Sequence, residues 1–237
     1  MTHGLRVFNQ ASGSVQIDET YANFALLAKV TVTTDLVGVQ IGAYLNVTGD
    51  TPIIAIRSET HFVAHQFTTR SGSSWSFFVQ AFNADGTLAS GADITCYVYD
   101  KPWALVGPFG YGLAVWDAAG ALTFHSSRRY LRVEALLTGA DYRTSLPAAT
   151  YPAGRTYAVI PAKLIGTIDV DSVASGSIGE YINSFFMQIL GFKFGATTLS
   201  GADCLAVEDV QTSTTPNIPE HYDYVDYAYL VVDVTHQ

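Results

Sequence analysis

Short runs of alternating apolar and polar residues recur along the chain. Residues 94–99 alternate in this way, as do residues 30–33, and residues 157–160 form a short continuous apolar run. A period of two is typical of a strand with one buried face, and a short apolar run between turn residues is typical of a fully buried strand. The pattern therefore predicts an all-β protein.

A turn signature separates several of these runs. An aromatic residue is followed by Asn or Asp and, a few residues later, by Gly, within 8–13, 82–86 and 116–120. Asn or Asp opens a type I turn by bonding the backbone, and Gly adopts the left-handed conformation that closes it. The signature predicts β-hairpins and gives these glycines a structural role.

The chain contains an internal repeat of domain size. Three segments of the first half return in the same order, shifted by 108 to 111 residues: 4–9 at 112–117, 76–82 at 184–190, and 87–93 at 198–203. A period near 100 residues matches a small domain rather than a solenoid repeat. We therefore predict two tandem homologous β-sandwich domains, 1–103 and 112–210, joined by a linker at 104–111.

Two regions need the repeat to be interpreted. Apolar residues in 180–190 have helical spacing, but the matching residues 75–82 run into a hairpin turn, so we expect both segments to be strands. Residues 211–237 follow the second repeat. They are expected to form a loop and an extra C-terminal strand at 224–234, without a counterpart in the first repeat.

Low charge is the most informative feature of the composition. Only 14% of the 237 residues are charged and 49% are hydrophobic, whereas about 25% of an average soluble domain is charged. Extended uncharged surface favours contact with partners, including further copies of the chain. We therefore expect an oligomer or a larger assembly. A soluble surface built from Ser, Thr and Gly is the alternative.

The net charge of −9 is concentrated at the C-terminal end. Seven acidic residues and no basic residue follow Lys193. A face of this sign repels phosphate backbones, so we expect no nucleic-acid partner. The sequence also begins without a signal-peptide pattern and has no apolar run of about 18 residues, so no membrane span is expected.

The sequence carries no recognisable catalytic motif, and we expect neither enzyme activity nor a cofactor. His61 and His65 are four residues apart but lack the context of a zinc motif. Asp169 and Asp171 lie on one face of a predicted strand. They fit the edge of a hairpin better than a catalytic carboxylate pair.

Two further sets of residues are better explained by structural roles than by chemistry. Asp203, Glu208 and Asp209 are clustered carboxylates that Ca²⁺ accepts, but their spacing differs from that of an EF-hand loop. Cys96 and Cys204 each follow a Ser-Gly-Ala-Asp segment. We expect related places in separate domains, where they are buried free thiols.

Tyrosine and arginine supply the candidate interaction residues. Tyrosine among acidic residues suits both sugar binding and protein interfaces, and we favour the interface. Three nearby arginines form the only basic cluster. The candidate interface residues are Tyr222, Tyr224, Tyr227, Tyr229, Arg128, Arg129 and Arg132.

Residues 4–21 and 112–132 resemble the opening of small proteins encoded among the tail genes of tailed bacteriophages. Residues 111–115, Tyr-Gly-Leu-Ala-Val, match that opening best, and the first copy has His3 in place of the tyrosine. Those proteins have no described enzymatic activity. The resemblance implies a virion component of the tail tip or its fibres, made in the host cytoplasm, with other tail proteins as partners.

The sequence therefore supports two functions from different classes. The first is a structural adaptor at the tail tip or fibre base, which joins tail components for host adsorption. The second is a lectin-like module that binds host surface glycan through exposed Tyr and Trp side chains.

Overall fold

The computed structural model describes residues 7–8, 15–17, 23–38, 40–102, 111–162, 165–175, 177, 180–217 and 219–237. Every regular element in these ranges is a β-strand, so the all-β prediction is confirmed. No helix in the described part of the chain is long and apolar enough to cross a membrane. The predicted linker, 104–111, lies outside the described residues except for its last position.

The strands are rich in Val, Ile, Thr and aromatic residues, which fit a pleated and half-buried surface. In chain order they are β1 (Val7–Phe8), β2 (Val15–Ile17), β3 (Ala25–Thr33), β4 (Asp35–Val37), β5 (Gln40–Thr48), β6 (Ile53–Arg57), β7 (Phe62–Ser71), β8 (Ser74–Phe82), β9 (Asp93–Asp100), β10 (Ala114–Trp116), β11 (Leu122–His125), β12 (Val133–Gly139), β13 (Ala148–Thr150), β14 (Tyr157–Pro161), β15 (Gly166–Ala174), β16 (Tyr181–Phe194), β17 (Thr198–Ser213), β18 (Glu220–Tyr224) and β19 (Tyr227–Asp233). The segment with helical spacing, 180–190, lies mainly in strand β16, as expected.

The turn signature forms the predicted turns at both described sites. Gly86, after β8, has φ +83° and donates its N–H to the Asn83 carbonyl over 3.1 Å. Gly120, between β10 and β11, has φ +82° and makes the same bond to Asp117. Both glycines occupy the left-handed region, where a side chain would be strained.

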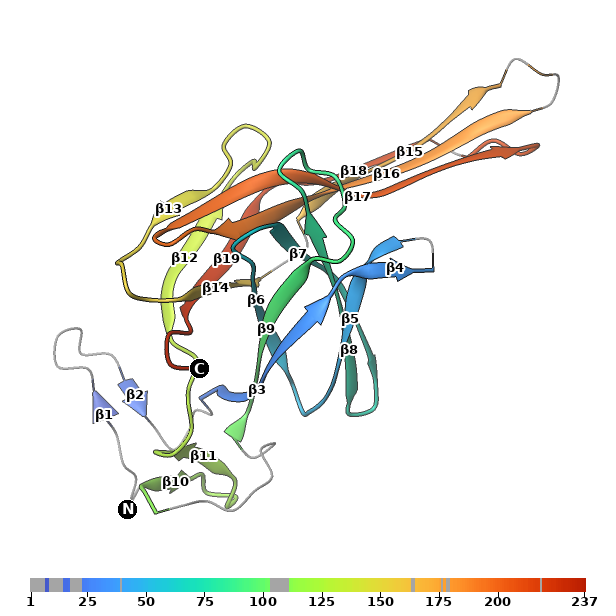
Figure 1. Ribbon diagram of the computed structural model, residues 1–237. Coiled ribbons are helices and arrows are strands. Elements are labelled where there is room, and N and C mark those ends of the chain that lie inside the picture. The colour runs from blue at the N-terminus through green and yellow to red at the C-terminus, as the bar shows by residue number, and fades with distance from the viewer. Residues whose placement is uncertain are drawn as a thin grey trace.

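One large sheet has six strands in the order β12-β19-β14-β6-β9-β3. Counted outward from its centre, the first half of the chain supplies β6, β9 and β3, and the second half supplies β14, β19 and β12. The central strands β6 and β14 pair with each other through Ile56 and Val159. The two halves of the chain therefore contribute matching strands on either side of one midline (Figure 1).

The match extends to an irregularity in the pairing. Strand β3 has a register shift between Leu26 and Ala28 opposite β9. Strand β12 has one between Val133 and Ala135 opposite β19. A β-bulge is a specific local feature, so its occurrence 107 residues apart in matching strands supports the internal repeat.

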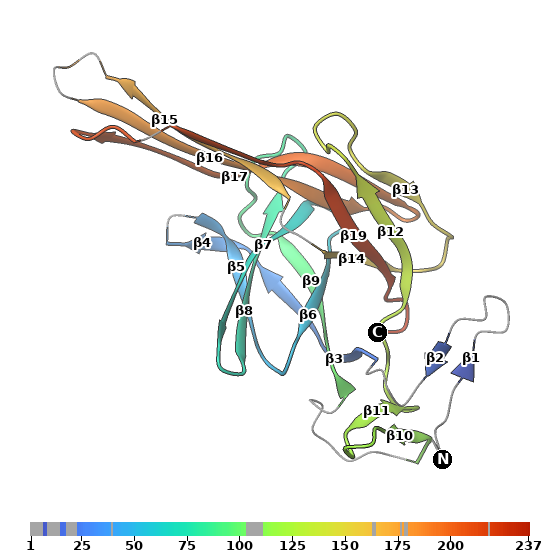
Figure 2. The same cartoon turned by 180° about the vertical axis from the view of Figure 1, so that it is seen from behind.

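The other large sheet has nine strands, of which seven follow the order β13-β17-β16-β7-β8-β5-β4. Strand β15 pairs with β16, and β18 pairs with β15. Strand β7 meets β16 through Val63 and Phe192, so this sheet also joins the two halves of the chain. Figure 2 shows β15, β16 and β17 extending together away from the rest of the molecule, and Figure 1 shows β18 beside β15.

The main core lies between the two large sheets. Val98 and Val231 from the six-stranded sheet pack in one cluster with Val79 and Phe192 from the nine-stranded sheet, and all four are fully buried. Burial of apolar surface between two sheet faces is the main stabilising contribution in a sandwich. The described strands therefore form a sandwich whose core both halves of the chain share.

The predicted division into separate sandwiches, 1–103 and 112–210, is not confirmed. Both large sheets contain strands from both halves, and the core described above is common to them. A short apolar strand such as β6 or β14 can pair with any strand of matching register. The sequence pattern therefore marked the strands without revealing which of them are neighbours.

The chain ends in a strand, as expected, but this strand has a counterpart in the first half, which was not expected. Residues 220–233 form two strands in different sheets, β18 and β19. Strand β19 lies between β12 and β14, as β9 lies between β3 and β6. The inserted strands of the second half are β17 and β18, so Cys204 on β17 has no structural relation to Cys96 on β9. Both thiols are free and buried, as predicted.

Candidate functional site

The most prominent feature of the molecule is a projecting arm, defined as strands β15, β16, β17 and β18. Its strand order is β18-β15-β16-β17, and all neighbours are antiparallel. Strands β16 and β17 have 14 and 16 residues, against an average of about 5–6. At about 3.3 Å per residue, a strand of that length extends roughly 50 Å. Figure 1 shows the arm leaving the two-sheet body.

Both edges of the arm have open backbone groups. Strand β18 pairs with β15 on one side only. Between Val207 and Ser213, the sole strand partner of β17 in the described part of the chain is β16. An open edge presents unpaired N–H and C=O groups, on which another strand can pair.

One face of the arm carries exposed apolar side chains. Val173 lies opposite Ile182, and Val210 lies opposite Ser184, two residues further along β16, so all three apolar side chains point to the same side. Val173, Ile182 and Val210 are exposed. The apolar face and the open edges meet at the same end of the molecule.

Strand β18 is attached to β15 and to the segment after β12 by a charged network. His221 donates through Nδ1 to Asp169 of β15, and its Nε2 lies 3.0 Å from Asp223. Arg143 bonds Asp223 over 3.0 Å and Asp141 over 3.2 Å. The hydrogen bond to Asp169 and then that to Asp223 raise the pKa of His221 above its usual value. This network also explains Asp169, which pairs with a histidine and not with Asp171.

The structure separates the four candidate tyrosines into two pairs. Tyr222 and Tyr224 lie on β18 and are 44% and 45% exposed. Tyr229 lies on β19, is 5% exposed and packs against the Phe192 ring at 4.1 Å between centroids. Tyr227, also on β19, is half-buried. Only the β18 pair remains available to a partner.

The three candidate arginines follow the β11 strand and do not lie on the arm. Arg132 lies 3.6 Å from the buried Asp233 carboxylate, so its charge is engaged within the chain. Arg129 is exposed, and its carbonyl accepts the Leu26 N–H. Arg128 is half-buried. The candidate arginines and the exposed tyrosines of β18 therefore lie on different parts of the molecule.

The aspartates and histidines weighed above as metal ligands do not come together in the described part of the chain. No group of three or more such side chains among the described residues could hold an ion. Asp203 and Asp209 lie six residues apart on the extended β17, roughly 20 Å along the strand. His61 and His65 each bond a different threonine hydroxyl, at 2.9 and 2.8 Å.

The two cysteine thiols are buried and have raised pKa values. Burial raises the pKa of the Cys96 thiol to about 12, and it raises the pKa of Cys204 to about 12 as well. A thiol that stays protonated is a poor nucleophile. Neither cysteine therefore supplies a reactive group.

Comparison of the chain with protein-family models, with curated protein sequences and with solved structures finds no match. The geometry of the chain itself therefore has to carry the functional argument.

The arm was not predicted from the sequence, because no single residue is specific to it. Val173, Ile182 and Val210 each fit an ordinary half-buried strand by pattern. A signal was nevertheless present in the second half, where the segment between residue 190 and the last strand is about 25 residues longer than the matching segment between residue 82 and β9.

Proposed function

We propose that this protein is a structural component of a bacteriophage tail, an adaptor at the tail tip or fibre base that joins tail components. The projecting arm carries the proposal, because its open strand edges can pair with a strand of a neighbouring subunit. Pairing of this kind uses main-chain hydrogen bonds and needs no catalytic residue. In a symmetric assembly, the same arm contact is repeated by every copy.

Two further observations support an assembly role. The chain has few charged residues, 14% of the total, which suits surfaces that become buried against other subunits. The exposed apolar side chains of the arm lie on one face of three neighbouring strands, Val173 on β15, Ile182 on β16 and Val210 on β17. Their burial on assembly would add to the strand pairing.

The assignment to a phage tail comes from the resemblance of residues 111–115 and the hairpin that follows. This hairpin is formed by β10 and β11. It lies far from the arm in Figure 1, at the same end of the molecule as β1 and β2. The protein would therefore have one end with the family-like hairpins and another with the arm, as an adaptor between two neighbours requires.

Immunogold labelling of intact particles tests the location. An antibody against the purified chain should label the tail tip, and label confined to other positions or absent from the particles would refute the proposal. The arm is tested separately by Ile182→Lys with Val210→Lys. The double variant should fold normally and be depleted at least tenfold from purified particles.

Leu136→Lys is the matched control for the arm variant. Leu136 is a comparably exposed apolar residue, but it lies on β12 at the edge of the other sheet. Equal incorporation of the arm variant and the wild type would exclude an assembly role for the arm. Equal depletion of the arm variant and the control would show that surface charge alone matters.

A further inference from the structure

A second surface, the outer face of strands β5, β8 and β7, has a composition unlike that of the arm. Cross-strand register places Tyr44, Phe78 and Phe67 side by side in an aromatic row. The next two rows toward the strand ends contain only small polar residues. They are Asn46, Ser76 and Thr69, followed by Thr48, Ser74 and Ser71.

The aromatic row forms a supported platform. The Phe67 ring stacks on Phe78 at 5.0 Å with an interplanar angle of 18°, and Tyr44 lies 4.8 Å from Phe78 on its other side. Phe78 is buried beneath them, while Tyr44 is 44% and Phe67 36% exposed. Gly42 leaves room for the Phe78 ring, because a Cβ there would collide with it. The two outer rings are therefore held in place and remain accessible.

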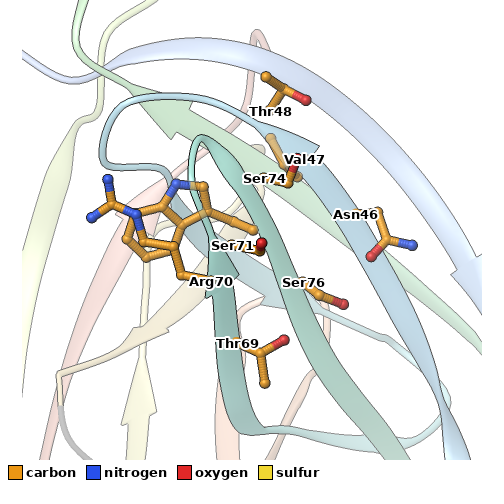
Figure 3. Close-up of a pocket in the computed structure, with 9 residues that line it drawn as sticks. Asn46, Val47, Thr48, Thr69, Arg70, Ser71, Ser74 and Ser76 are labelled. Carbon is orange, nitrogen blue, oxygen red and sulfur yellow. The ribbon is translucent and has the colours of Figure 1, made fainter.

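The two polar rows have unused hydrogen-bonding capacity. Within the described residues, none of these six side chains makes a hydrogen bond, although together they carry five hydroxyl groups and one amide. They line a hollow of about 510 Å³ over the ends of the three strands (Figure 3). That volume lies in the range of small-ligand sites, roughly 300–1,000 Å³.

The surface is almost uncharged. Arg70 is the one charged residue that lines the hollow, and strand alternation directs its side chain to the opposite face of the sheet, with Val47 and Trp75. There its Nε donates to the Gly72 carbonyl over 2.8 Å, and its guanidinium lies 4.6 Å from the Trp75 ring. A ligand in the hollow and on the aromatic row therefore meets rings, hydroxyls and an amide. Asp35, opposite Gly42, is on the same side of the sheet but beyond the aromatic row.

We infer that this aromatic–polar face binds a neutral oligosaccharide. A pyranose ring has an apolar C–H face, which stacks on an aromatic side chain, and a rim of hydroxyls, which pair with serine, threonine and asparagine. No charged side chain points into the hollow from this face, which matches a neutral sugar. A protein partner fits less well, because the centre of a stable protein interface is apolar over a far larger area than two exposed rings provide.

A glycan array tests the inference directly. The full chain is applied to an array of neutral, sialylated and sulfated oligosaccharides, and the best neutral member is titrated by calorimetry. Binding to neutral members is expected. Tyr44→Ala and Phe67→Ala should each weaken that binding about tenfold, the effect of losing one ring contact.

A third variant and a control separate binding from folding. Thr69→Glu adds charge and bulk to an exposed position of the polar rows, away from the core, and should abolish binding without lowering the melting temperature. Tyr222→Ala removes an equally exposed tyrosine from the arm and should leave binding unchanged. Absence of binding to any neutral member, binding to anionic members only, or binding that survives Thr69→Glu would overturn the inference.

Discussion

A shared core predicts that a buried residue in either half of the chain stabilises the whole molecule. Val98 on β9 and Val231 on β19 occupy matching strands, and both are fully buried in the cluster between the large sheets. Val→Ala removes two methyl groups, at about 0.8 kcal/mol each, and leaves a cavity. Val98→Ala and Val231→Ala should therefore each lower the free energy of unfolding by about 2–3 kcal/mol.

Differential scanning calorimetry is the decisive assay for this pair. For a protein of this size, the expected loss corresponds to a fall in Tm of roughly 5–10 °C. Each variant should move a single unfolding transition of the whole protein to lower temperature. Urea unfolding followed by circular dichroism should place the wild type and the variants in the same order of stability. Val173→Ala, an exposed position on the arm, is the control, with a change within about 0.5 kcal/mol.

Two outcomes would refute the shared core. The first is a pair of separate transitions, of which Val98→Ala moves only one and Val231→Ala only the other, as two independent sandwiches would give. The second is a loss below about 1 kcal/mol for Val231→Ala, which would mean that β19 is a peripheral addition.

Three further predictions concern single groups. Because Asp169 and Asp223 stabilise the protonated ring and so raise the pKa of His221, this residue should hold β18 most firmly below about pH 6.5 and progressively less as the pH rises through its folded pKa. Amide exchange of β18, corrected for intrinsic rates, should show this, and a pH dependence that persists in His221→Ala would contradict it. Gly42→Ala should cost about 1–3 kcal/mol, measured by urea unfolding, because its Cβ meets the Phe78 ring, and an unchanged midpoint would mean that the aromatic row is loosely packed. Cys96 and Cys204 should react with a thiol reagent only in denaturant, and rapid labelling of the native protein would show that the thiols are accessible.

Local signals gave a sound account of the strands and turns. Alternation at 94–99 marked β9, and the Asn83 and Asp117 turns close with left-handed glycines where the signature placed them. The repeat also settled the ambiguous segment 180–190, whose matching segment belongs to β8. Each of these features depends on the residues next to one another in the chain.

The candidate tyrosines lie closer together in the sequence than in the structure. Tyr222, Tyr224, Tyr227 and Tyr229 are neighbours in sequence, and all four were predicted as interface residues. A change of sheet between residues 224 and 227 sends the first two to the arm and Tyr229 to the core. The spacing of residues in the sequence does not reveal such a change of sheet, because both strands have the same alternating pattern.

The sequence by itself determined the strand content, the hairpin turns, the internal repeat and the low surface charge of this protein. Only the tertiary structure decided that β6 and β14 pair to join the halves, that β16 and β17 run on into an arm, and that Tyr44, Phe67 and Phe78 meet in one row. The physical reason is the range of the interactions. Alternation and turn chemistry act within a few residues, whereas strand pairing depends on which distant edges and faces complement each other.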